Sequence, residues 1–262
     1  MVLDTDASFS ISRLAEQAQH LLRKQSSSTL HPDNEHVDDI LLPALEHVHI
    51  FRPQSLASTT ATLRSLPDYL FNASRHHSLD RQVAFIALDS ASAFYWQDKA
   101  DTEDAPLLTV TTAGMKQQGG STGYTALSAA LKSACATFSC PAIFTSWHLG
   151  IVPAPQHASQ HRVRSLRPNL PVPFSQLPTL RLITQRVPVK KFPAGTSAEE
   201  ALREAPDRQK AVEEGSFVCV VNEWGVDERT LQRLQRVGSG FGFGISAEGL
   251  TMEDDVVGGD EH

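Results

Sequence analysis

Acidic side chains follow two apolar segments of the sequence that have the character of buried strands. Residues 83–88 are all apolar and end on Asp89, and the apolar residues 2–3 lead into Asp4 and Asp6. The carboxyl ends of parallel strands meet at one edge of a sheet, so these acids are expected to converge there. Such carboxylates could hold Mg²⁺ beside a phosphate and orient an attacking water. The alternative is that each acid caps the helix after it, and the pattern alone leaves both interpretations open.

A phosphate-binding loop should accompany such acids, and the sequence contains no GxxxxGK[ST] motif. The one candidate is the segment 117–123, QQGGSTG, which precedes a predicted helix. Its backbone amides could bind an anion. It contains no lysine and follows no predicted strand, so a flexible loop is the favoured interpretation.

The charge of the chain is unevenly distributed. The formal net charge is −7, yet the segment 148–198 contains no Asp or Glu, so all 30 acidic residues lie elsewhere. A cationic segment on an anionic protein suits contact with a polyanion, and a merely solvated basic face is the alternative. The segment contains seven basic residues: Arg162, Arg164, Arg167, Arg181, Arg186, Lys190 and Lys191.

Length and composition favour one compact α/β domain. The chain has 262 residues, of which 40% are hydrophobic, enough to bury a core. It has no apolar run of membrane-spanning length and no secretory signal, which predicts a protein of the cytosol or nucleus. Its three cysteines form no CxxC pair, which favours reduced thiols over disulfides.

Strand-like and helix-like segments alternate along the chain, which predicts a doubly wound parallel core with antiparallel additions toward the C-terminus. Expected strands cover 2–3, 47–51, 83–88, 141–146, 179–187 and 217–223, with a glycine-rich strand or hairpin at 240–250. Expected helices cover about 9–24, 56–71 and 126–138, with a proline-broken helical insert at 197–214. Loops are expected over 25–39, 100–123 and 152–178.

Several segments resemble RecA-type strand-exchange recombinases. The opening VLDTDASFSISRL resembles the strand and helix that follow the phosphate loop in this family. RPQSLASTTATLRSLPDYL (52–70) and FIALDSASAFYWQD (85–98) resemble a eukaryotic branch, the recombinase paralogues. The string LDSxSAFYW is the most specific part, and a weaker resemblance continues through 142–147 and FVCVVNEWGV (217–226).

The resemblance implies a RecA-like parallel-sheet ATPase core over 1–250, with antiparallel C-terminal strands and an acidic disordered tail over 251–262. The family's first strand and phosphate loop would precede Met1, so we expect the sequence to be a truncated version of a longer chain. ATP and magnesium are expected cofactors if that upstream loop exists.

The family's nucleotide site can be carried over in part. Asp89 matches the acid that holds magnesium through water, with Ser90 on the magnesium-nucleotide side. Asp6 falls where active recombinases have a catalytic Glu, which makes it a candidate for orienting water. Its side chain is one methylene shorter, and a displacement of about 1 Å can cost roughly 10²-fold in rate. Trp147 lies near the family's usual γ-phosphate-sensing Gln, so ATP binding without hydrolysis is the expectation.

The family's two DNA-facing loops would correspond to 98–124 and 148–178. Within them we expect phosphate contacts from Lys116, Arg162, Arg164 and Arg167, giving salt-sensitive binding of single-stranded or branched DNA. The resemblance implies a nuclear subunit for homologous recombination and double-strand-break repair that binds sister paralogues. The alternatives are a DNA-dependent ATPase and a pseudo-ATPase scaffold that binds only protein.

Overall fold

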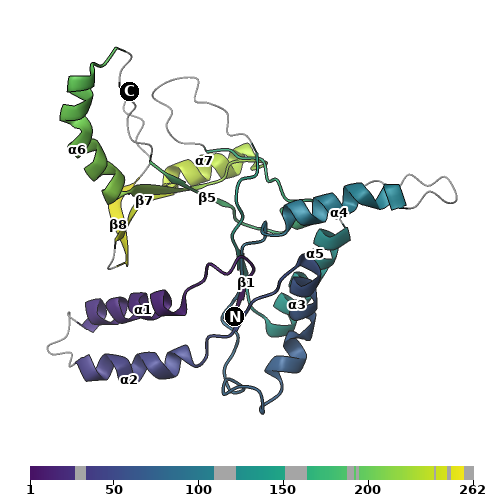
Figure 1. The fold of residues 1–262 in the computed structure, drawn as a ribbon. Coiled ribbons are helices and arrows are strands. Elements are labelled where there is room, and N and C mark those ends of the chain that lie inside the picture. The colour runs from purple at the N-terminus through teal and green to yellow at the C-terminus, as the bar shows by residue number, and fades with distance from the viewer. Residues whose placement is uncertain are drawn as a thin grey trace. The chain divides into compact units, whose positions relative to one another are not determined.

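The computed structural model describes residues 1–26, 34–108, 122–150, 164–187, 192, 195–238, 240–246 and 249–256. The chain divides into two compact units. The first unit consists of residues 1–150 and 168–177, and the second consists of residues 151–167 and 178–262. Figure 1 shows their helices and strands along the chain.

A parallel sheet lies at the centre of the first unit, as the sequence predicted. Its strands follow the order β2-β1-β3-β4, and every neighbouring pair is parallel. The strands are β1 (Val2–Asp4), β2 (Ile50–Phe51), β3 (Ile86–Asp89) and β4 (Ala142–Phe144). The helices of this unit are α1 (Ile11–Ser26), α2 (Asn34–Leu45), α3 (Leu56–Leu70), α4 (Tyr95–Leu108) and α5 (Thr122–Phe138), with a 3-10 turn at Phe174–Gln176.

The main hydrophobic core lies between one face of this sheet and the helices α3 and α5, which pack against each other. The register aligns Leu3 with Leu88 and Leu88 with Phe144, so these side chains share that face. Leu66 of α3 and Leu127 of α5 are buried in the same cluster. The predicted apolar face of α5 is confirmed, since its members Leu127, Leu131 and Ala134 are all buried.

The start of α3 was also predicted correctly. The Ser55 side chain accepts a hydrogen bond from the Ser58 amide, and the Ser58 hydroxyl oxygen accepts one from the Ser55 amide. This capping box satisfies two backbone donors that have no partner inside the helix.

Two predicted loops contain helices. The loop predicted over 25–39 and the residues after it include α2, which buries Val37 and Leu41, four residues apart, and contacts α1. The loop predicted over 100–123 overlaps α4, where the Lys99 ammonium lies 3.8 Å from a Glu103 carboxylate oxygen. Both predictions were wrong because polar composition hid the spacing of three and four residues that stabilises these helices.

The second unit contains an antiparallel sheet with the order β5-β6-β7-β8. Its strands are β5 (Leu182–Arg186), β6 (Ser216–Val221), β7 (Gly240–Ser246) and β8 (Gly249–Val256), and its helices are α6 (Ala198–Glu214) and α7 (Glu228–Val237). The predicted C-terminal strands and hairpin are present, but they form a sheet of their own and do not extend the parallel one. Every residue of β5 pairs with a residue of β6, so β5 belongs to the antiparallel sheet.

In the second unit, one helix and one strand are longer than the sequence predicted. The helix α6 continues through Pro206, where a break was expected. A Ser197 and Glu200 capping box and a Glu204–Arg208 ion pair of 2.8 Å support it on both sides of the proline. The strand β8 reaches Val256, so the first residues of the expected acidic tail belong to the sheet, and 257–262 lie outside the described residues.

None of the described helices has the length and apolar character needed to cross a bilayer. Cys140 and Cys219 are buried free thiols, and Cys135 is a partly buried one.

Candidate functional site

One polar residue from each parallel strand lies at the carboxyl edge of the parallel sheet. Asp4 of β1 pairs in register with Asp89 of β3. Arg52 follows β2 beside Asp4, and Thr145 follows β4 beside Asp89. We call Arg52, Asp4, Asp89 and Thr145 the polar edge row. Since side chains alternate between the faces of a strand, the row lies on the face opposite the α3 and α5 core.

The two carboxylates of this row have different environments. Asp4 has a fully buried side chain, and its Oδ2 accepts a hydrogen bond of 3.1 Å from the Arg52 Nε. Its Oδ1 accepts a bond of 3.3 Å from the Phe9 amide. Asp89 is only partly buried and accepts a hydrogen bond from the Thr145 hydroxyl. Within the described residues no cation pairs with Asp89, so its negative charge is the one that a ligand cation would find uncompensated.

Ser90 is placed differently from Asp89, although the sequence assigned both to the nucleotide side. Ser90 is buried, and its hydroxyl lies 2.9 Å from the Ser92 hydroxyl. Its amide donates to the Thr5 hydroxyl oxygen, and the Thr5 hydroxyl donates to its carbonyl, both at 2.7 Å. Ser90 therefore fixes the chain after β3 and does not expose its hydroxyl to solvent.

Asp6 does not join the polar edge row. It is exposed, and its Oδ1 accepts a hydrogen bond of 3.2 Å from the Ser8 amide. The described structure contains no hydrogen bond or ion pair between Asp6 and Asp89. This contact is a local turn and not the helix cap that the sequence left open, because α1 begins only at Ile11.

Arg52 is the member of the row that the sequence reasoning missed. The signal was its position, one residue beyond the short strand β2 and level with the first strand-end acid. Its guanidinium donates a hydrogen bond to the buried Asp4 side chain, which explains how this polar group is tolerated there. Asp4 is consequently a structural acid, and Asp89 is the candidate ligand.

The residues expected to contact DNA are only partly described. Lys116 and Arg162 lie outside the described residues. Arg164 and Arg167 belong to the second unit, where Arg167 is exposed and the Arg164 carbonyl accepts a 2.9 Å bond from the Glu223 amide. The polar edge row belongs to the first unit, as does the position of Lys116, whereas the three arginines were predicted on a segment of the second unit.

No group of three or more His, Cys, Asp or Glu in the described part of the chain could hold a metal ion. A magnesium ion needs fewer protein ligands, because it keeps several waters and binds through one or two carboxylates together with phosphate oxygens. Asp89 meets that requirement in part, as one carboxylate without a cationic partner.

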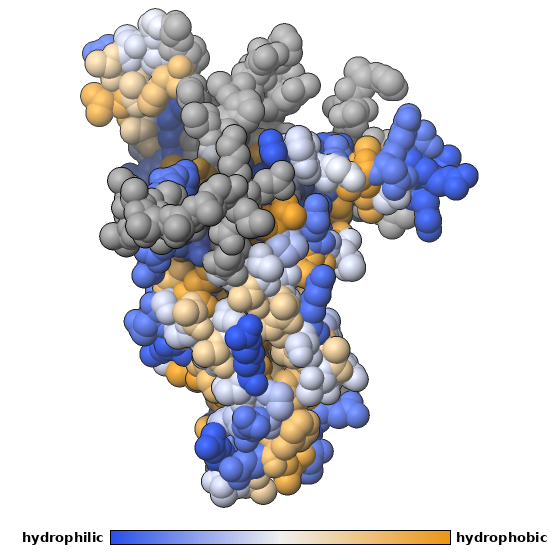
Figure 2. Space-filling view, turned by 90° about the vertical axis from the view of Figure 1, so that its right-hand side faces the viewer, coloured by the Kyte–Doolittle hydropathy of each residue, from blue (hydrophilic) through white to orange (hydrophobic). Residues whose placement is uncertain are grey.

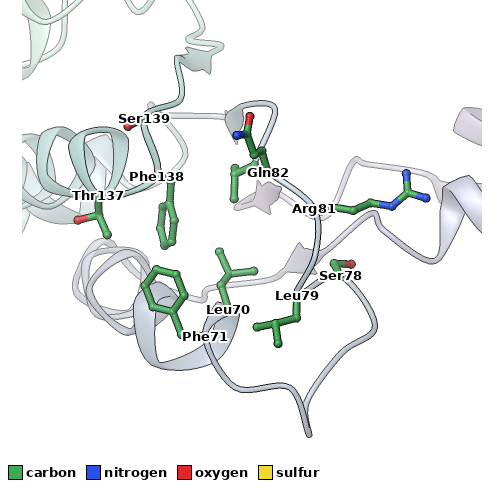
Figure 3. A pocket seen from close by; sticks show the side chains of 10 residues that line it. Leu70, Phe71, Ser78, Leu79, Arg81, Gln82, Thr137, Phe138 and Ser139 are labelled. Atoms are coloured by element: carbon green, nitrogen blue, oxygen red, sulfur yellow. The ribbon is translucent and has the colours of Figure 1, made fainter.

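A cavity of about 330 Å³ lies elsewhere in the first unit, between the C-terminal ends of α3 and α5 and the segment 78–83. Leu70, Phe71 and Phe138 line it, and the Arg81 side chain points away from it (Figure 3). Apolar and polar side chains alternate on the surface around α3 and α5 (Figure 2), and Phe71 there is 67% exposed. The lining is mixed, because Ser78, Gln82, Thr137 and Ser139 accompany the apolar side chains.

A histidine cluster adjoins this cavity. The Ser78 hydroxyl lies 2.7 Å from the His47 Nδ1 and 3.0 Å from the His49 Nε2. The His49 Nδ1 lies 3.0 Å from the Tyr69 hydroxyl, and the rings of His49 and His76 are 5.1 Å apart. Burial lowers the pKa of His49, and the nearby His76, the amino terminus and His47 lower it further.

This cluster predicts an acid-sensitive first unit. The unfolded chain binds a proton at His49 more readily than the folded chain does, so stability falls as the pH drops below about 6.5. Urea unfolding measured across this range should show a falling midpoint for the parent protein and a smaller fall for His49→Gln. The exposed neighbour His77 provides the control: His77→Gln should retain the parental pH dependence, and identical profiles for His49→Gln and the parent would contradict the assignment.

Comparison with known proteins gives no identification. No family model matches the chain, and no curated protein matches it.

Proposed function

We propose that this chain is a nuclear DNA-repair subunit of the recombinase-paralogue type. In this proposal it supports homologous recombination and double-strand-break repair by binding sister paralogues and single-stranded DNA. Among the recombinase paralogues, its segments 52–70 and 85–98 most resemble X-ray repair cross-complementing protein 2. That resemblance is the reason for proposing sister paralogues as binding partners.

The observation that carries the DNA-binding proposal is the distribution of charge. All seven basic residues of the acid-free segment belong to the second unit, although the chain as a whole has a net charge of −7. Phosphate contacts from such cations supply most sequence-independent affinity for nucleic acid. If the protein bound only other proteins, this separation of basic from acidic residues would have no function.

A nucleotide role receives narrower support. Asp89 ends a parallel strand at the edge where open α/β sheets bind ligands, and it has no cationic partner among the described residues. It would be the residue that holds magnesium beside the phosphates of ATP. ATP and magnesium would bind only if a phosphate loop precedes this sequence, and the exposed position of Asp6 away from Asp89 favours binding without hydrolysis. The DNA-dependent ATPase remains the second candidate and is favoured by Asp89 alone.

The triple substitution Arg162→Ala, Arg164→Ala and Arg167→Ala tests the DNA-binding proposal. We expect weaker binding of single-stranded DNA and a decrease of about two to three units in the slope of log affinity against log salt. Fluorescence anisotropy with a labelled oligonucleotide at several salt concentrations measures both quantities.

A matched triple variant removes the same charge from the same unit. Arg229, Arg233 and Arg236 are exposed on α7, outside the acid-free segment. Their replacement by Ala should leave most of the salt slope intact. Equal effects of the two triple variants would show that only net charge matters, and no binding by the parent protein would favour the protein-only scaffold.

A further inference from the structure

One buried side chain at the end of β6 holds two other parts of the second unit together. Asn222 is 7% exposed, and its Oδ1 accepts hydrogen bonds of 3.1 Å from the Leu166 amide and 3.0 Å from the Trp224 amide. Its Nδ2 donates a bond of 2.8 Å to the Leu166 carbonyl. Because a single oxygen atom binds both amides, the chain at Leu166 and the chain at Trp224 are fixed beside each other.

Two further contacts fix the segment 164–167, which belongs to no helix or strand. The Glu223 amide donates a hydrogen bond of 2.9 Å to the Arg164 carbonyl. The Leu166 side chain packs against the buried core of the second unit. The segment therefore has a defined position against the end of β6, although it is part of the acid-free region of the chain.

Two side chains beside this anchor are available to a ligand. Arg167 is exposed, and no carboxylate of the described residues forms an ion pair with it. Trp224 is 43% exposed, and no aromatic ring or cation within the described part of the chain stacks on its indole. Trp96 of the first unit is different, because its ring contacts Tyr95 with centroids 5.0 Å apart and has the Lys99 ammonium 5.2 Å from its centroid.

We propose that the Trp224 indole stacks on an unpaired base of single-stranded DNA while the Arg167 guanidinium contacts a phosphate of the same strand. Every base has an aromatic face, so stacking of this kind tolerates any sequence. This inference rests on the proposed function. It adds a base contact to the phosphate contacts expected of the arginines at 162–167.

The surroundings of the indole favour DNA over a protein partner. Tryptophan and arginine also dominate protein interfaces, but there they are surrounded by contacts that exclude water. The exposed neighbours here are small or polar, namely Ser165, Gly225 and Asp227. Protein–DNA interfaces are polar and contain ordered water, so such a setting suits a strand that touches the ring and leaves its surroundings hydrated.

The test measures binding of two ligands to the full chain by fluorescence anisotropy. The ligands are an oligothymidylate and an abasic oligonucleotide of equal length. Trp224→Leu keeps apolar bulk without a ring, Trp224→Phe keeps a smaller ring, and Arg167→Ala removes the cation. Two controls keep the Trp224 indole: Glu223→Gln changes the charge of the adjacent residue, and Trp96→Leu removes an exposed indole from the first unit.

We expect Trp224→Leu to weaken oligothymidylate binding by about 5- to 150-fold, the effect of losing one stacked base, and Trp224→Phe to retain most of the affinity. Both Trp224 variants should bind the abasic strand like the parent. Arg167→Ala should weaken binding of both ligands and lower the salt slope by about one unit. Glu223→Gln and Trp96→Leu should retain the parental preference for the oligothymidylate over the abasic strand.

The outcomes separate this inference from the proposed function. If the parent binds both ligands equally and Trp224→Leu changes neither affinity, the base contact is wrong while charge-based DNA binding stands. Equal losses for Trp224→Leu and Trp96→Leu would also overturn the assignment. If the parent binds neither ligand, the proposed function fails as well. Altered self-association of Trp224→Leu in sedimentation velocity, with parental DNA affinity, would place the indole in a protein interface and overturn the inference.

Discussion

Replacement of Leu66 by alanine is expected to lower the free energy of unfolding of the first unit by about 2–5 kcal/mol. Leu66 is completely buried between α3, α5 and the parallel sheet, so the truncation removes apolar contacts and leaves a cavity. Such a loss is a large fraction of the stability of an ordinary domain.

Urea unfolding followed by circular dichroism measures this effect. Two compact units can unfold in separate transitions, and only the transition of the parallel-sheet unit should move. The control is Leu21→Ala on α1, where the parent side chain is 58% exposed and the cost should stay within about 0.5 kcal/mol. Equal losses for the two variants would contradict the core described for this unit.

Replacement of Gly240 by alanine is expected to destabilise the second unit by about 1–3 kcal/mol through overpacking. A Cβ atom at Gly240 would lie 2.5 Å from the Cys219 carbonyl oxygen and 2.7 Å from the Val220 Cγ1. The carbonyl oxygen cannot move without disturbing the pairing of β6 with β7, because Gly240 pairs in register with Val220, and the Val220 side chain is restrained by its burial in the core.

Gly244 of the same strand provides the matched control. A Cβ atom there would meet only the exposed Thr251 Oγ1, at 3.0 Å, and that side chain can rotate away. Denaturation of Gly240→Ala and Gly244→Ala should therefore separate the two variants, with the loss confined to the transition of the antiparallel sheet. A larger effect at Gly244 would show that the packing around β7 is different.

The sequence alone determined the features that depend on local pattern. The apolar run before Asp89 predicted β3, the Ser55 cap predicted the start of α3, and the spacing of Leu127 and Leu131 predicted the buried face of α5. These features succeed because hydrophobic period and capping chemistry act between residues that are close in the chain. The polar composition around α2 and α4 misled the same reasoning, because α2 is stabilised by contact with another helix and the Lys99–Glu103 pair of α4 consists of polar residues that are equally common in loops.

The candidate site divides in the same way. Asp89 was predicted from its place at a strand end, and the structure places it in the polar edge row. The assignment of Asp4 to a structural role required Arg52, 48 residues away, and the burial of Ser90 required its partners around Thr5 and Ser92.

Only the tertiary structure decided which strands pair and which side chains meet across them. It separated the C-terminal strands into their own sheet, joined Ser78 to histidines 29 and 31 residues earlier, and aligned Phe217 with Phe243. The physical reason is that register and sheet order depend on the packing of whole faces, whereas a sequence pattern specifies only how each segment alternates between core and solvent.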